Sequence, residues 1–170
     1  MRVMVGIDDS DASFYALQWT LDHLVSGNSN VINATNESSE ETGMVTVAHV
    51  QQPFQHFLYP AGPGGVAGFY PTSAVVESVR KAQAETSSAL LSRALKMCKD
   101  KMIKAETLIL EGDPKDMICQ ATEQMHVDLL VIGSRGLGKI KRAFLGSVSD
   151  YCAHHAHCPI LIVKPPKGQQ

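Results

Sequence analysis

A glycine-rich segment is the part of the sequence whose residue types best suit ligand binding. It reads Gly133-Ser134-Arg135-Gly136-Leu137-Gly138-Lys139 and directly follows the apolar run 129–132. Glycines at a strand end permit positive φ and let backbone N–H groups approach a phosphate closely. The P-loop pattern holds up to Lys139, but Ile140 stands where a hydroxyl must hold Mg²⁺, and Lys141 replaces the third glycine of the dinucleotide pattern. The segment therefore predicts either a phosphate loop of neither standard kind or a plain glycine turn.

A second candidate phosphate site opens the last expected helix, 146–155. Gly146-Ser147-Val148-Ser149 would offer free N–H groups, the positive end of a helix dipole and two hydroxyls. The alternative is simple capping by Ser147, which needs no ligand. Between the two glycine sites lie three basic residues, Lys139, Lys141 and Arg142. The two glycine sites and this basic segment could together surround a polyphosphate.

Short apolar runs alternate with helical patterns and must position these residues. We expect strands at 2–7, 44–50, 105–110, 127–132 and 159–163, with helices between most of them. Unbroken apolar strands are typical of a parallel sheet that is buried on both faces. The predicted fold is α/β, a doubly wound five-stranded parallel sheet with helices on both faces, whose ligand cleft lies beyond the carboxyl ends of the strands.

Apolar spacing and capping residues define the expected helices. Ser10-Asp11 and Asp113-Pro114 are typical helix starts. The residues expected to face the core are Phe14, Leu17, Leu21 and Leu24 in the first helix, Val76, Val79, Thr86, Leu90, Ala94 and Met97 in the second, and Met117, Ile118, Ala121 and Met125 in the third. Trp19 is expected to be a partly buried packing residue.

Two long connections interrupt this pattern within what we expect to be one domain, residues 1–170. Residues 26–43 form a polar linker, and residues 51–71 form a loop rich in glycine, proline and aromatic residues. We expect both to be mobile. The aromatic residues of the second connection indicate that part of it packs on a ligand, a partner or the domain itself.

The glycine sites have a spacing that resembles a known family. The pattern Gly133-x2-Gly136-x9-Gly146-Ser147 is similar to the nucleotide signature of the ATP-binding branch of the universal stress protein family. The start Val5-Gly6-Ile7-Asp8-Asp9-Ser10 and the turn Gly112-Asp113-Pro114 also resemble that family. The ending, 147–159, looks like its plant members in particular, and the resemblance extends over the whole chain.

The resemblance implies a set of nucleotide-binding residues and a Rossmann-like fold. Asp8 would bind the ribose hydroxyls, Ile7 would lie near the base, and Val50 would meet the adenine edge through its backbone. Gly133 would approach the ribose. The implied cofactor-binding set is Ile7, Asp8, Val50, Gly133, Arg135, Gly136, Gly146, Ser147, Val148 and Ser149. The last five of these would hold the phosphates. A strand-end carboxylate accepts hydroxyl donors well, although Asp8 could instead serve as a loop or capping carboxylate beside Asp9 and Ser10.

The function that follows from this resemblance is regulatory. We expect a stress-response protein that binds ATP, ADP or AMP with Mg²⁺ and acts as a dimeric, nucleotide-dependent switch. The homodimer would pair through the last strand, which begins at Pro159 and ends at Val163. One alternative is a slow ATPase or phosphotransfer enzyme, although no catalytic residue is evident. The other is a nucleotide-free interaction module or chaperone.

Composition and charge exclude several other classes. The chain has 170 residues, is 44% apolar and carries a formal net charge of −2, so we expect no attraction of the whole surface to nucleic acid or an anionic membrane. No apolar run approaches the roughly 20 residues of a membrane helix. The first residues do not read as a signal peptide, so we expect a cytoplasmic protein whose four cysteines stay reduced.

A cluster of cysteines and histidines near the end of the chain invites a metal interpretation. It comprises Cys152, His154, His155, His157 and Cys158. One helix cannot easily direct four of these side chains at a tetrahedral centre, and Pro159 ends the helix at once. We therefore expect no metal site formed by protein side chains alone.

Overall fold

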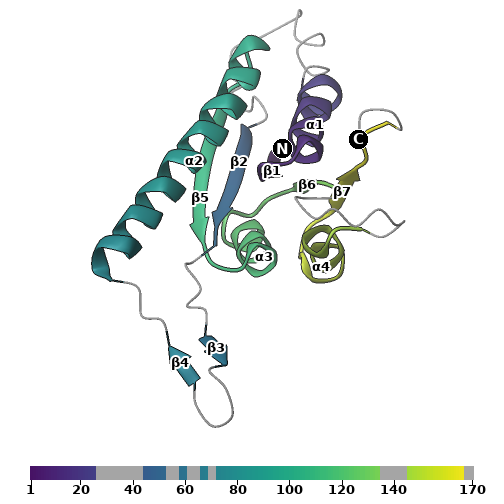
Figure 1. The fold of residues 1–170 in the computed structure, drawn as a ribbon. Helices are drawn as coiled ribbons and strands as arrows, with labels where there is room; N and C mark the ends of the chain where they lie inside the picture. The colour runs from purple at the N-terminus through teal and green to yellow at the C-terminus, as the bar shows by residue number, and fades with distance from the viewer. Residues whose placement is uncertain (26–43, 53–57, 61–65, 69–71, 135–144, 167–170) are drawn as a thin grey trace, which may run out of the picture.

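A five-stranded parallel sheet forms the centre of the computed structural model, as the sequence predicted (Figure 1). The structure describes residues 1–25, 44–52, 58–60, 66–68, 72–134 and 145–166. The strand order is β5-β2-β1-β6-β7. Their bounds are β1 Arg2–Ile7, β2 Met44–Gln51, β5 Ala105–Glu111, β6 Leu129–Gly133 and β7 Ile160–Val163.

Helices cover both faces of this sheet, so there are two hydrophobic cores. They are α1 Asp11–Thr20, continued by a π-helical turn over Leu21–Val25, then α2 Ser73–Asp100, α3 Pro114–Gln124 and α4 Ser147–His155. Alternate residues of β1 face opposite cores: Val3 and Val5 pack with α1 and α2, whereas Met4 packs with α3 and α4. All three are at most 2% exposed, which is why the strand reads as a continuous apolar run.

The helix starts lie where the capping residues predicted. Ser10 is the N-cap of α1, and its hydroxyl accepts a hydrogen bond from the Ser13 amide at 3.3 Å. Asp113 caps α3 by accepting from the Lys115 amide at 3.2 Å, with Pro114 in the first turn. Both caps satisfy N–H groups that a helix end leaves without an intrahelical partner.

The predicted core face of α2 was wrong at one residue. Leu90 and Ala94 are buried, but Thr86 is exposed and its hydroxyl donates to the Ala82 carbonyl at 2.9 Å. Its neighbour Ser87 is buried instead, and it accepts a hydrogen bond from the Gln51 side chain at 2.8 Å. A polar side chain fits this core position because it has a polar partner at the end of β2.

The connection expected as a loop over residues 51–71 contains two short strands. The two short strands β3 (Leu58–Pro60) and β4 (Val66–Gly68) pair antiparallel in a separate ribbon, which lies beyond the ends of β2 and α2 in Figure 1. Strands of three residues with proline and glycine give no readable alternation, so the sequence pattern missed them. The 26–43 linker lies outside the described residues.

The strand predicted at 127–132 begins later, at Leu129. Val127 still closes the end of α3, because its amide donates to the Thr122 carbonyl at 3.0 Å. Asp128 accepts a hydrogen bond from the Arg2 amide at 2.6 Å and so holds the beginning of β1. Val127 is also buried, which explains why the apolar pattern begins before the strand.

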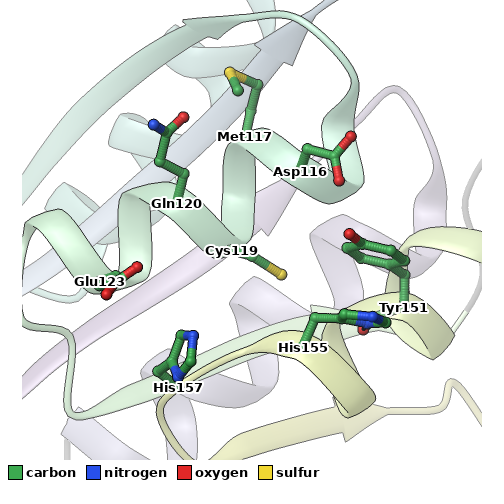
Figure 2. A pocket seen from close by; sticks show the side chains of 8 residues that line it. All are labelled: Asp116, Met117, Cys119, Gln120, Glu123, Tyr151, His155 and His157. Carbon is green, nitrogen blue, oxygen red and sulfur yellow. Dashed lines mark hydrogen bonds between the residues drawn. The ribbon is translucent and has the colours of Figure 1, made fainter.

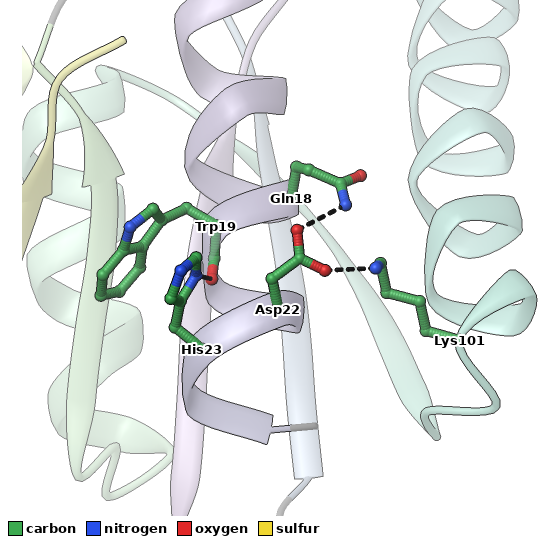
Figure 3. A network of polar contacts seen from close by, with 5 residues as sticks. All are labelled: Gln18, Trp19, Asp22, His23 and Lys101. Carbon is green, nitrogen blue, oxygen red and sulfur yellow. Dashed lines mark hydrogen bonds and ion pairs between the residues drawn. The ribbon is translucent and has the colours of Figure 1, made fainter. Parts of the chain in front are cut away.

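A polar network joins the end of the first helix to the end of α2 (Figure 3). Asp22 accepts from the Gln18 amide at 2.8 Å and pairs with Lys101. Lys101 therefore links the end of α2 to the end of the first helix. Trp19 is half-buried, as expected, and stacks on His23 at 4.7 Å between ring centroids. Among the described helices, none combines the length and apolarity that crossing a membrane requires.

Candidate functional site

The carboxyl ends of β1, β2 and β6 meet at one edge of the sheet, where the order of the strands reverses. β1 pairs with β2 on one side and with β6 on the other. In open α/β sheets this reversal is where ligands bind. Asp8 follows β1 and Ser134 follows β6, so the topology brings together several of the residues that the sequence singled out.

Asp8 is half-buried and keeps one carboxylate oxygen available. Its Oδ1 accepts hydrogen bonds from the amide of Ser10, at 3.1 Å, and from the hydroxyl of Ser10. Its Oδ2 accepts none from a described residue. Asp8 thus stabilises the loop after β1 through Oδ1, as expected for a loop carboxylate. Its Oδ2 remains available to accept a hydrogen bond from a ligand.

Ser13 stabilises this loop and was missed by the sequence analysis. Its buried hydroxyl lies 2.9 Å from the carbonyl oxygen of Asp8 and 2.9 Å from that of Ser10, and it can donate to either. The same hydroxyl accepts a hydrogen bond from the Asp8 amide at 3.2 Å. The available signal was its place three residues after the N-cap, in the first turn of α1.

Gly133 lies against the first turn of α1. A Cβ atom built at Gly133 would lie 2.9 Å from the carbonyl carbon and oxygen of Ala12 and 3.0 Å from the Ser13 nitrogen. All three are backbone atoms. The structure therefore gives this glycine a packing role that is separate from the predicted approach to a ribose.

Hydrogen bonds bring Gly146 next to the residue that follows the first glycine site. The Gly146 amide donates to the Ser134 carbonyl at 2.8 Å, and the Ser134 amide donates to the Val163 carbonyl at 2.8 Å. Gly146 thus lies at the end of β6. Arg135 and Gly136, with the basic residues between the two sites, lie outside the described residues (135–144).

The first turn of α4 presents backbone donors at this same edge. Gly146 is its N-cap and supplies no side-chain cap. The amides of Ser147, Val148 and Ser149 donate to no described residue, and the Ser147 side chain is exposed. Such a helix terminus is suited to an anion.

Ser149 differs from Ser147 in where its hydroxyl lies. It is 1% exposed, and its hydroxyl is 2.9 Å from the Gly146 carbonyl and 3.4 Å from the Ser134 carbonyl. Its side chain therefore holds the two glycine sites together. Only its backbone amide is placed to serve a ligand.

The end of β2 supplies the other side of this edge. Pairing of β2 with β1 stops at His49, whereas pairing with β5 continues through Val50 and Gln51. The backbone of Val50 thus extends beyond its neighbour, which suits the predicted contact with a base. His49, which the sequence analysis did not select, is half-buried with Nδ1 3.1 Å from the Ile7 carbonyl.

A separate, open pocket of about 320 Å³ lies between α3 and α4. Figure 2 shows its lining: Asp116, Met117, Cys119, Gln120, Glu123, Tyr151, His155 and His157. Tyr151 and His155 stack with ring centroids 3.9 Å apart, and the nearby Asp116 carboxylate raises the pKa of Tyr151. None of the predicted nucleotide residues lines this pocket. Within the described ranges, no group of three metal-ligating side chains is arranged to hold an ion.

Comparison with known proteins gives one consistent result. A family model described as the universal stress protein family matches residues 1–164. A universal stress protein A-like protein of Arabidopsis thaliana is 29% identical over 172 residues, covering 96% of this chain and 89% of its own. A universal stress protein of Methanocaldococcus jannaschii is 34% identical, covering 99% and 84%.

Solved structures of similar proteins share the fold. A universal stress protein family protein of Arabidopsis thaliana, crystallised with AMP bound, is 26% identical with a TM-score of 0.63, covering 99% of this chain and 94% of its own. UspA from Lactobacillus plantarum superposes with a TM-score of 0.69 at 21% identity, covering 96% and 97%. The second similarity concerns the fold alone.

Proposed function

The chain belongs to the universal stress protein family, and on this basis we propose that it binds an adenine nucleotide at the carboxyl edge of its sheet. The first turn of α4 carries the proposal: three amides without a protein partner in the described part of the chain, beside the end of β6. The Arabidopsis relative that is 26% identical was crystallised with AMP, which supports the same ligand class.

Each part of the nucleotide has a chemically suitable neighbour in this proposal. The phosphates lie at the amides of Ser147, Val148 and Ser149, assisted by the Ser147 hydroxyl. The ribose hydroxyls donate to the Oδ2 atom of Asp8. The base lies beside Ile7 and the extended backbone of Val50.

The charge distribution favours a nucleotide that carries a divalent cation. The exposed Asp150 lies in the first turn of α4 and adds negative charge near the proposed phosphate position. Mg²⁺ is commonly held by the phosphates themselves and by water. We therefore propose ATP with Mg²⁺ as the ligand, with the Gly136 region and Arg135 completing the phosphate site.

Calorimetry on two aspartate variants tests this assignment. Asp8→Asn keeps an oxygen for Ser10 but replaces the available Oδ2 by an amide that cannot accept. Losing hydrogen bonds to a charged acceptor costs about 1.5–3 kcal/mol, so ATP affinity should fall about 10- to 100-fold. The matched control is Asp9→Asn, since Asp9 is exposed and makes no hydrogen bond to a described residue.

The outcome of this titration separates the possibilities. Asp9→Asn should bind as the wild type does, and both variants should unfold at the wild-type denaturant concentration. No heat from wild-type protein up to millimolar ATP, or equal affinity in all three proteins, would contradict the proposed site.

We also propose that nucleotide binding acts on a homodimer formed through β7. Within the described residues β7 pairs only with β6. Ile160, Leu161 and Ile162 are only half-buried at this edge, and an open apolar edge strand tends to pair. Sedimentation equilibrium should give twice the 18.4 kDa chain mass, and a monomer with and without ATP would refute the dimeric switch.

A further inference from the structure

Two cysteine thiols meet between α3 and α4, away from the proposed nucleotide residues. Cys119 of α3 donates a hydrogen bond to the sulfur of Cys152 in α4, and the two sulfur atoms are 3.6 Å apart. Figure 2 shows the Cys119 side chain pointing from α3 toward α4. A disulfide has about 2.05 Å between its sulfurs, so the two atoms would have to approach each other by about 1.5 Å.

The two thiols differ in how they meet solvent. Cys119 is half-buried and lines the open pocket, so a small dissolved molecule can reach it. Cys152 is completely buried in the core formed with α3 and β6, and its thiol also points to the Lys115 carbonyl at 3.9 Å. One thiol is thus placed to meet an oxidant, and the other needs only to reach its neighbour.

We propose that Cys119 and Cys152 form a reversible intramolecular disulfide when the protein meets a small-molecule disulfide oxidant such as oxidised glutathione. The Cys119 thiolate attacks one sulfur of the oxidant, which forms a mixed disulfide and releases one glutathione thiolate. The Cys152 thiolate then attacks the Cys119 sulfur and releases the second. The protein pair loses two electrons and two protons, and the oxidant is reduced to two thiols.

The surroundings make this exchange slow at neutral pH. Burial raises the pKa of Cys119 and raises that of Cys152 further, so few thiolates are present. The titratable and charged groups around the pair or lining its pocket are Asp116, Glu123 and Lys115 of α3, Tyr151 and His155 of α4, and His157 and Cys158 beyond it. The nearby Asp116 carboxylate also disfavours the thiolate. The rate should therefore rise about tenfold per pH unit through the neutral range, as the thiolate fraction does.

The disulfide would join α3 to the helix that carries the proposed phosphate donors. Cys152 follows Ser149 by three residues, on the same side of α4. Any effect on nucleotide affinity rests on the proposed function. Formation of the bond does not, since it is measured without nucleotide.

Mass spectrometry of the intact chain tests the proposal. Wild-type protein is incubated with oxidised glutathione at pH 8, quenched with iodoacetamide and analysed whole and after proteolysis. The expected product lacks two hydrogens, about 2 Da, and takes up two fewer carbamidomethyl groups on quenching than the reduced protein does. It contains a Cys119–Cys152 linked peptide and returns to the thiol form with dithiothreitol.

Three cysteine variants provide the controls. Cys158→Ser should still form the bond, since Cys158 is not a partner. Cys152→Ala should instead accumulate a glutathione adduct on Cys119, and Cys119→Ser should form neither product. A far-UV circular dichroism spectrum like that of the wild type shows that each variant is folded. A linkage through Cys158, a persistent adduct in the wild type or no oxidation would each overturn the proposal.

Discussion

Replacing Gly133 by alanine tests whether this glycine serves packing or the ligand. The new Cβ would lie 2.9–3.0 Å from backbone atoms of Ala12 and Ser13, which cannot rotate away as a side chain could. The first turn of α1 would have to move by a few tenths of an ångström. Overpacking of this kind costs about 1–3 kcal/mol, and the reduced freedom of the unfolded chain returns about 0.4–1 kcal/mol.

Urea unfolding and thermal unfolding, each followed by circular dichroism, measure this effect. A net loss of about 1–2 kcal/mol should lower the melting temperature by roughly 2–8 °C for a chain of this size. Gly6→Ala is the matched control in the neighbouring strand, because its Cβ would lie 3.0 Å from Ile118 Cδ1, the end of a flexible side chain. The control should lose less stability.

Two results would refute the reasoning. One is unfolding of Gly133→Ala at the wild-type urea concentration, and the other is a larger loss of stability in Gly6→Ala than in Gly133→Ala. If nucleotide affinity fell while stability stayed unchanged, the ribose interpretation of Gly133 would replace the packing one.

Three further substitutions have effects that follow from named contacts. Ser149→Ala should lower the free energy of unfolding by about 1 kcal/mol, because a buried hydroxyl loses its carbonyl partners; an unchanged urea midpoint would contradict this. Asp113→Ala should cost about 1 kcal/mol through the lost cap of α3, measured in the same way. Asp22→Asn should cost less than about 1 kcal/mol, since the ion pair with Lys101 is partly exposed. The hydrogen bond from Lys101 lowers the pKa of Asp22 in the folded protein. The stability difference between the wild type and Asp22→Asn should therefore be present above pH about 4 and vanish as the pH falls through the pKa of Asp22 in the folded state.

The sheet could be predicted because burial on both faces imposes a pattern that neighbouring residues share. β1 was predicted at its observed bounds, Arg2–Ile7, since four of its side chains are nearly inaccessible to solvent. The caps at Ser10 and Asp113 were predicted because a short polar side chain before a helical pattern has few other uses. The β3–β4 ribbon was not, because three-residue strands with glycine and proline carry no such pattern.

The residues of the candidate site were predicted by type, but their individual environments were not. Ser147 and Ser149 are equivalent in the sequence pattern. In the structure Ser147 is exposed, whereas Ser149 is buried and its hydroxyl bonds to a backbone carbonyl. That difference arises from the Gly146–Ser134 hydrogen bond, which joins residues that are twelve apart in the sequence. The Cys119–Cys152 contact was equally unpredictable, because it depends on how α3 packs against α4.

Nuclear magnetic resonance of the backbone amides tests the central claim most directly, since the proposed phosphate ligands are themselves N–H groups. ¹⁵N-labelled protein is titrated with ATP and Mg²⁺, and each amide signal is followed. The account predicts saturable shifts at Ser147, Val148 and Ser149, while Cys119 and Glu123 in the α3–α4 pocket stay unchanged. Signals at Ser147–Ser149 that do not move at saturating ATP, or shifts confined to the pocket, would contradict it.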